Sequence, residues 1–69
     1  MDKTEFESNW KTMRVRVKEW WGRLRDDELD RTRGNAGQLI GLLQKKYGYT
    51  RERAEKEFDR RLSEVVSPL

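Results

Sequence analysis

Residues 4–24 have the sequence TEFESNWKTMRVRVKEWWGRL, and this stretch decides the fold class. Its large apolar side chains recur every three or four residues, which is the spacing of one face of an α-helix. At a rotation of about 100° per residue they lie within an arc of about 80°; they are Phe6, Trp10, Met13, Val17, Trp21 and Leu24. Thr4 and Glu7 have the spacing of a capping box, and Gly22 is expected to end the helix in a left-handed conformation. The stretch predicts one long amphipathic helix.

A short second helix is predicted to follow. The acidic run 26–28 would lie at its N-terminus, where negative charge is favourable against the helix dipole. The helix would end by Gly34, and Leu29 is its one clear core residue. It is therefore the least strongly encoded of the predicted helices.

Two further helices complete the prediction. Asn35 is placed to cap the third helix and Gly48 to end it, whereas Thr50 is placed to cap the fourth. Gly37 and Gly41 inside the third helix cost ~1 kcal/mol each relative to Ala, so they indicate either close helix approach or a soft helix. The core-facing side chains predicted for these two helices are Ala36, Leu39, Ile40, Leu43, Tyr47, Ala54, Phe58, Leu62 and Val65.

The expected fold is all-α, a compact bundle of about four short helices arranged as helical hairpins. Residues 1–66 are predicted to form a single domain, and residues 67–69 a frayed tail. With 69 residues, 42% of them charged and no Cys or His, only one thin core is available, which typically supplies no more than ~3–5 kcal/mol. The centre of that core is predicted to contain Trp10, Val17, Trp21, Leu39, Leu43, Tyr47 and Phe58.

Two ordered blocks of residues extend from about Asn9 to Glu57. The first consists of Asn9-Trp10-Lys11, Val17-Lys18-Glu19, Trp21-Gly22, Leu24 and Asp26-Asp27. The second consists of Gly34, Gln38-Leu39, Gly41, Gln44, Tyr47-Gly48-Tyr49 and Ala54-Glu55-Lys56-Glu57. In this order and at these spacings they resemble the CsbD-like family of small bacterial general stress-response proteins. The resemblance implies a helical domain of about four short helices, a bacterial protein induced by stress, and no established enzymatic activity.

The composition argues against catalysis. Without His or Cys, the commonest general base and the best thiol nucleophile are both missing. The acids at 26–28 and Asp30 are assigned to helix capping, because they lack the alternating ligands and central glycine of a calcium loop. No catalytic, cofactor-binding or metal-binding residue is predicted. The charged N-terminus and the absence of an apolar run of ~20 residues predict a cytoplasmic protein without membrane contact.

Two binding hypotheses remain open. On the predicted first helix, four basic side chains project within about 60° of one another and could neutralise phosphates; they are Lys11, Arg14, Lys18 and Arg25. Trp20 lies beside this basic ridge and could stack on an unpaired base. The alternative is a solvated face whose Lys and Arg stems cover the core edge. Trp20 and Leu42, both off the main apolar faces, could instead form a protein-partner surface, although a monomer is expected.

The functional prediction is a non-enzymatic, stress-associated protein that is either protective through its hydrophilic surface or weakly associated with a macromolecule. Its extreme hydrophilicity, with a mean hydropathy of -1.18, suits a protein that stays soluble while others aggregate. The alternative function is weak, salt-sensitive nucleic-acid binding through the basic ridge.

Overall fold

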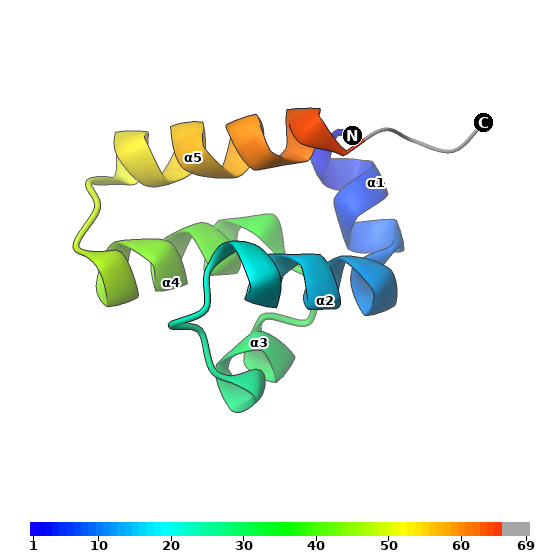
Figure 1. Ribbon diagram of the computed structural model, residues 1–69, viewed down its shortest axis with the longest axis horizontal. Helices are drawn as coiled ribbons and strands as arrows, with labels where there is room; N and C mark the ends of the chain where they lie inside the picture. Colours follow the sequence, from blue (N-terminus) through cyan, green and yellow to red (C-terminus); the bar gives the residue numbers. More distant parts are fainter. Residues whose placement is uncertain (66–69) are drawn as a thin grey trace.

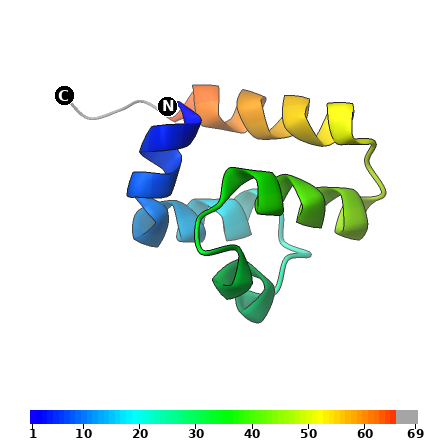
Figure 2. The ribbon, with the colours of Figure 1, turned by 180° about the vertical axis from the view of Figure 1, so that it is seen from behind.

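The computed structural model describes residues 1–65, which form an all-α bundle in which α4 and α5 make an antiparallel hairpin (Figure 1). Helix α1 stands across one end of the bundle beside the C-terminal end of α5, and α3 packs beneath α4 (Figure 2). The helices are α1 (Lys3–Ser8), α2 (Trp10–Trp20), α3 (Asp26–Thr32), α4 (Ala36–Tyr47) and α5 (Arg51–Glu64). The predicted fold class is confirmed.

The predicted long first helix is wrong in one respect, because the chain bends at Asn9 and forms α1 and α2 separately. The side-chain amide of Asn9 donates to the carbonyl oxygen of Glu5 at 2.9 Å, beside the backbone N–H of Asn9, which donates to the same oxygen at 3.0 Å. The cap is also displaced: Asp2, not Thr4, accepts from the backbone N–H of Glu5 at 2.8 Å. The bend lets Phe6 reach α5, so tertiary packing overrides the local periodicity.

Gly22 does not end α2 in a left-handed conformation. The helix ends at Trp20, and Trp21 leaves it in a non-helical conformation with φ −129°. Within residues 1–65, left-handed backbone occurs at Arg33, Gly34 and Gly48. The chain makes a turn at 22–23, in which the backbone N–H of Leu24 donates to the carbonyl of Trp21 at 3.1 Å, and Trp21 is buried. The predicted glycine cap is therefore wrong, while the predicted burial of Trp21 is confirmed.

Helix α3 is better anchored than its sequence indicates. Leu29 is fully buried, and the buried Thr32 hydroxyl donates to the Leu29 carbonyl at 2.7 Å. The turn into α4 requires glycine at position 34, where φ is +82° and an added Cβ would lie 3.0 Å from the Cβ of Trp10. Helix α1 also reaches α4, since Glu7 accepts from the backbone N–H of Ala36 at 3.3 Å.

The predicted start and end of α4 and the predicted start of α5 are confirmed. Asn35 accepts from the backbone N–H of Gln38 at 2.9 Å, and Thr50 accepts from that of Arg53 at 3.1 Å. Gly48 ends α4 with φ +69°. Side-chain caps of this kind satisfy backbone donors that have no partner inside the helix.

All five helices contribute buried side chains to one core, and most of these residues are among those predicted. Trp10 and Tyr47 were expected at its centre, but both are only half-buried and pack against its edge, as does Val65. The predicted tail at 67–69 lies outside the described residues. The buried apolar residues are Phe6, Met13, Val17, Trp21, Leu24, Leu29, Ala36, Leu39, Ile40, Leu43, Ala54, Phe58 and Leu62.

Candidate functional site

The predicted basic ridge does not lie on one helix. Because α2 ends at Trp20, Arg25 lies beyond it and is the residue preceding α3. Its side chain approaches Asp27 with Nε 3.4 Å from Oδ1, and its backbone N–H donates to Glu28. The continuous helical phase used to place Arg25 is therefore wrong, although Arg25 and Lys18 line the same surface hollow.

Two members of the basic ridge are paired with α3. Lys18 Nζ lies 2.6 Å from Asp26 Oδ1, and Arg14 forms an ion pair with Asp30. The hydrogen bond and positive charge of Lys18, with a smaller contribution from Arg14, hold the pKa of Asp26 below its ordinary range. Lys11 is exposed and has no carboxylate partner within residues 1–65. The acids of α3 therefore neutralise part of the basic surface of α2.

Trp20 is half-buried rather than fully exposed. Its ring meets Trp21 edge to face, with ring centroids 5.6 Å apart and an interplanar angle of 83°. The indole packs against the core edge and leaves part of its surface open. This placement is compatible with either a structural or a contact role.

A stack of two tyrosines between two arginines, which the sequence did not predict, lies on the surface. Arg23 lies over the Tyr47 ring at 5.3 Å, and Arg53 lies over the Tyr49 ring at 4.8 Å. The two tyrosine rings are 5.6 Å apart and nearly parallel. We call these four residues the Arg–Tyr stack. It joins the loop after α2 to the turn between α4 and α5, which no helical periodicity encodes.

Replacing Tyr47 with phenylalanine tests whether the Arg–Tyr stack holds the loop after α2. The Tyr47 hydroxyl accepts from the backbone N–H of Arg23 at 3.2 Å. Losing this bond should lower the free energy of unfolding by about 0.5–1.5 kcal/mol, measured by urea denaturation. Tyr49→Phe is the matched control, because no hydrogen bond of the Tyr49 hydroxyl occurs within residues 1–65. Equal effects of the two substitutions would contradict the assignment.

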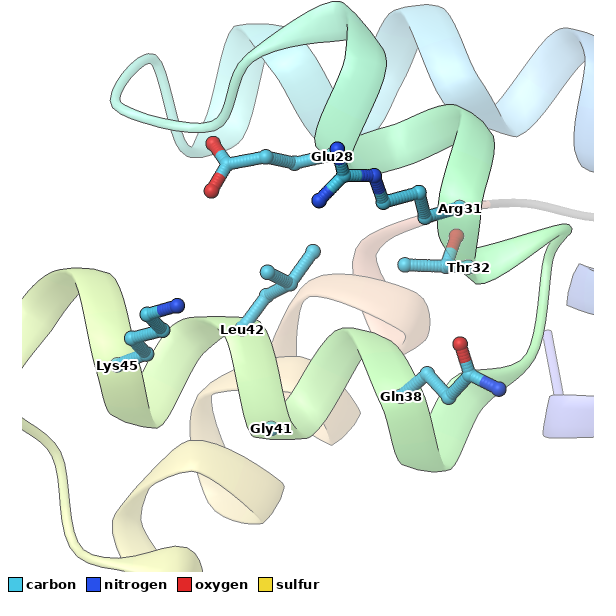
Figure 3. Close-up of a pocket in the computed structure, with 7 residues that line it drawn as sticks. All are labelled: Glu28, Arg31, Thr32, Gln38, Gly41, Leu42 and Lys45. Atoms are coloured by element: carbon cyan, nitrogen blue, oxygen red, sulfur yellow. The ribbon is translucent and has the colours of Figure 1, made fainter.

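A groove of about 300 Å³ lies between α3 and α4 (Figure 3). Leu42, the predicted partner residue on α4, extends into it and is half-buried. Trp20, the other residue of that prediction, is not among the lining residues, so the groove does not combine the two. The groove is lined by Glu28, Arg31, Thr32, Gln38, Gly41, Leu42 and Lys45.

Glu28 is held at the edge of this groove by two donors. Lys46 Nζ lies 2.8 Å from its Oε2, and the backbone N–H of Arg25 donates to its Oε1 at 3.0 Å. The hydrogen bond from Lys46, followed by that from Arg25, holds the pKa of Glu28 below its ordinary value of 4.5.

Acidification is expected to weaken the fold through Glu28. A carboxyl group whose pKa is lower in the folded state stabilises that state above its unfolded pKa, and the contribution disappears as the pH falls through the folded pKa. The free energy of unfolding should therefore decline below about pH 4.5, and Glu28→Gln should flatten this decline. Lys46→Gln, which removes the main cause of the shift, should also flatten it. Urea denaturation at a series of acidic pH values checks this, and an unchanged profile in both variants would contradict it.

Residues 1–65 contain neither a metal-binding cluster nor a membrane-spanning helix. No group of three or more His, Cys, Asp or Glu side chains there is arranged to hold a metal ion. No helix in the same range has the length and apolar character needed to cross a membrane.

The described helices and their paired surface charges define a small all-helical domain built around the hairpin of α4 and α5. The CsbD-like family model matches residues 4–56, and the chain belongs to this family. The resemblance seen in the sequence is thus confirmed. The chain is also similar to bacterial proteins, of which three are described here. UPF0337 protein YjbJ of Escherichia coli O6:H1 is 46% identical over 59 residues, covering 86% of each chain.

The other two relatives are similar in extent. UPF0337 protein ECA0631 of Pectobacterium atrosepticum is 46% identical over 57 residues, covering 83% of each chain. UPF0337 protein pc0632 of Protochlamydia amoebophila is 45% identical over 58 residues, covering 84% of this chain and 88% of its own. No solved structure matches the chain.

Proposed function

We propose that this protein is a non-enzymatic, stress-associated protein that protects neighbouring macromolecules through a hydrated, non-adhesive surface. Membership of the CsbD-like family supports the association with stress. The observation that carries the protective role is that few large apolar side chains of the described residues are exposed. Within residues 1–65 only Val15 is strongly exposed, at 60%.

The physical argument is that such a surface gives other proteins little to adhere to. Large exposed apolar patches drive association, whereas interspersed charges of both signs favour solubility. On α5, Glu52 pairs with Lys56 and Arg51 with Glu55, so opposite charges alternate along the exposed face. A protein of this kind can remain dispersed between aggregating chains at high concentration.

The test is survival of a sensitive enzyme, such as lactate dehydrogenase, through repeated freezing or drying. The informative variant carries Glu52→Leu and Lys56→Leu, which exposes two apolar side chains without changing the net charge. Its matched control carries Glu52→Gln and Lys56→Gln, which removes the same ion pair but stays polar. We expect protection from the natural chain and the glutamine variant, and reduced protection from the leucine variant.

Two outcomes would contradict the protective role. One is equal protection by the leucine variant, because the non-adhesive surface would then be irrelevant. The other is equal protection by the same mass of an unrelated small helical protein, because the effect would then be generic to added protein.

Weak nucleic-acid binding is the second candidate function. The supporting observation is that Lys11 is exposed on α2 without a carboxylate partner within residues 1–65, while Trp20 is partly open. Binding that also uses Arg14 and Lys18 would compete with the acids of α3. Arg25 would contribute from the start of α3 rather than from α2.

This competition gives a sharp test. Tryptophan fluorescence is followed during titration with single-stranded and duplex DNA and RNA, at low and near-physiological salt. If the basic ridge binds phosphates, Lys11→Ala should weaken binding, while Asp26→Asn with Asp30→Asn should strengthen it by releasing Arg14 and Lys18. Trp20→Phe should remove the fluorescence response if the indole stacks on a base. Absence of binding at both salt concentrations would rule out this function.

A further inference from the structure

We infer that the groove between α3 and α4 is a docking site for an acidic segment of a partner protein that presents an apolar side chain beside a carboxylate. This inference goes beyond the protective surface proposed above, because it assigns one specific site on an otherwise non-adhesive molecule. Three features of the groove support it: a helical glycine, a half-buried leucine and two cations that form no ion pair within residues 1–65.

The glycine is Gly41, in the middle of α4. Glycine there destabilises a helix relative to alanine. The other four glycines differ, because Gly22 lies outside any helix, Gly34 and Gly48 have positive φ, and a Cβ at Gly37 would crowd the capping oxygen of Asn35. At Gly41 an added Cβ would meet nothing within 4 Å. The packing of residues 1–65 therefore does not require this glycine, whereas close approach of a partner's backbone would.

Leu42 supplies the apolar contact. It extends from α4 towards α3 beside Gly41 and remains half-buried, while Leu39, Ile40 and Leu43 of the same helix are fully buried (Figure 3). An apolar side chain entering the groove would cover Leu42 and gain from removing both surfaces from water.

The charges at the edge favour an acidic occupant. Arg31 on α3 and Lys45 on α4 both line the groove, and neither forms an ion pair within residues 1–65. The one carboxylate of the lining, Glu28, is already held by Lys46 and by the backbone N–H of Arg25. The groove thus presents unpaired positive charge beside its apolar surface, and complementary charge selects for a carboxylate next to the docked side chain.

Other occupants fit less well. A second copy of this chain would approach with net positive charge, and its exposed Val15 lies on α2 close to Lys11 and Lys18. A long-chain fatty acid would supply a carboxylate, but Leu42 is the one large apolar side chain in the lining that could contact its tail. A peptide segment needs only one apolar anchor there and can place its carboxylates over Arg31 and Lys45.

Substitutions at Gly41 test binding in the groove separately from folding. Gly41→Ala is expected to raise the midpoint of thermal unfolding by about 4 °C or more, because it improves helix propensity in open space. Gly41→Gln should also fold, while its longer side chain obstructs the groove. Gly22→Gln is the matched control, since Gly22 likewise has nothing within 4 Å and lies outside the groove.

The probe is a synthetic amphipathic peptide of about 16 residues with leucines on one face and glutamates on the other. Its control has lysine in place of every glutamate. Binding to the full chain is followed by ¹H–¹⁵N correlation spectra, with the backbone amides of Gly41 and Leu42 as reporters. We expect saturable shifts centred on the groove with the acidic peptide, a loss of about tenfold or more in affinity for Gly41→Gln, and a change within about twofold for Gly22→Gln.

Charge reversal provides an independent arm. Arg31→Glu with Lys45→Glu should abolish binding, whereas Lys11→Glu with Arg16→Glu changes the net charge equally but lies outside the groove. The inference is overturned if the acidic peptide causes no shifts at the groove, if the lysine peptide binds as well, or if both charge pairs act equally. Groove shifts caused by laurate alone, or by raising the protein concentration without peptide, would overturn it in favour of an amphiphile or a second copy.

Discussion

Replacing Phe58 with alanine is expected to leave the chain largely unfolded at room temperature. Phe58 on α5 is completely buried between Phe6, whose ring lies edge to face at 5.1 Å, and Trp21, whose ring is stacked at 6.4 Å. Truncating a buried phenylalanine costs about 3–5 kcal/mol. That range equals the whole stability of about 3–5 kcal/mol that a core of this size supplies.

The measurement is urea denaturation followed by circular dichroism and tryptophan fluorescence. Phe58→Leu is the matched variant, because it preserves most of the buried volume and should cost less than about 1.5 kcal/mol. It is expected to remain folded with a lower midpoint. A cooperative transition for Phe58→Ala at the midpoint of the natural chain would refute the central place given to this side chain.

Replacing Leu29 with alanine is expected to cost about 2–5 kcal/mol and to release α3 selectively. Leu29 is the fully buried apolar side chain of α3, and an isolated helix of seven residues is not stable in water. Without it, the ion pairs from Arg14 and Lys18 to α3 are too weak to hold the helix, because exposed pairs contribute little.

Hydrogen exchange separates this result from global unfolding. The amides of residues 26–32 should lose protection in Leu29→Ala to a greater extent than those of the hairpin formed by α4 and α5. Leu42→Ala is the control, because its side chain is only half-buried and its loss should cost less. Equal loss of protection in α3 and in the hairpin would show that α3 is not a separable unit.

The hairpin of α4 and α5 was predictable because every signal for it is local. Asn35 and Thr50 supply the caps, Gly48 supplies the left-handed turn, and the apolar residues follow one helical period. The burial of Phe6 and Trp21 was also predictable from period alone. Local chemistry and tertiary packing agree at these positions.

The bend at Asn9 was not predictable from the same pattern. Apolar periodicity continues across it, since Phe6 and Met13 face the same core from two differently oriented helices. The bend follows from contact between α1 and α5, whose residues are far apart in sequence. Helical phase measured along the chain therefore assigned Arg25 to a helix that ends at Trp20, before it reaches that residue.

Among the candidate surface residues, too, some positions follow from helical phase and others depend on the tertiary fold. Trp20 and Leu42 were placed off the main apolar faces by their helical phase, and both are half-buried. The pairing of Lys18 with Asp26 and the Arg–Tyr stack depend on the path of the loop at 21–25, where the helical period of Trp21 and Leu24 continues although the helix has ended. Their partners could be identified only in three dimensions.

The closure of α1 onto α5 has a consequence for biogenesis. The ammonium group of Met1 donates to the carbonyl of Leu62. The ring of Phe6 packs against the ring of Phe58, which lies 52 positions later in the chain. During translation α1 therefore emerges long before its partner exists. Contacts with α2 and α4 can form first, but the apolar face of α1 is covered completely only after α5 has left the ribosome, and non-native association can compete during this interval.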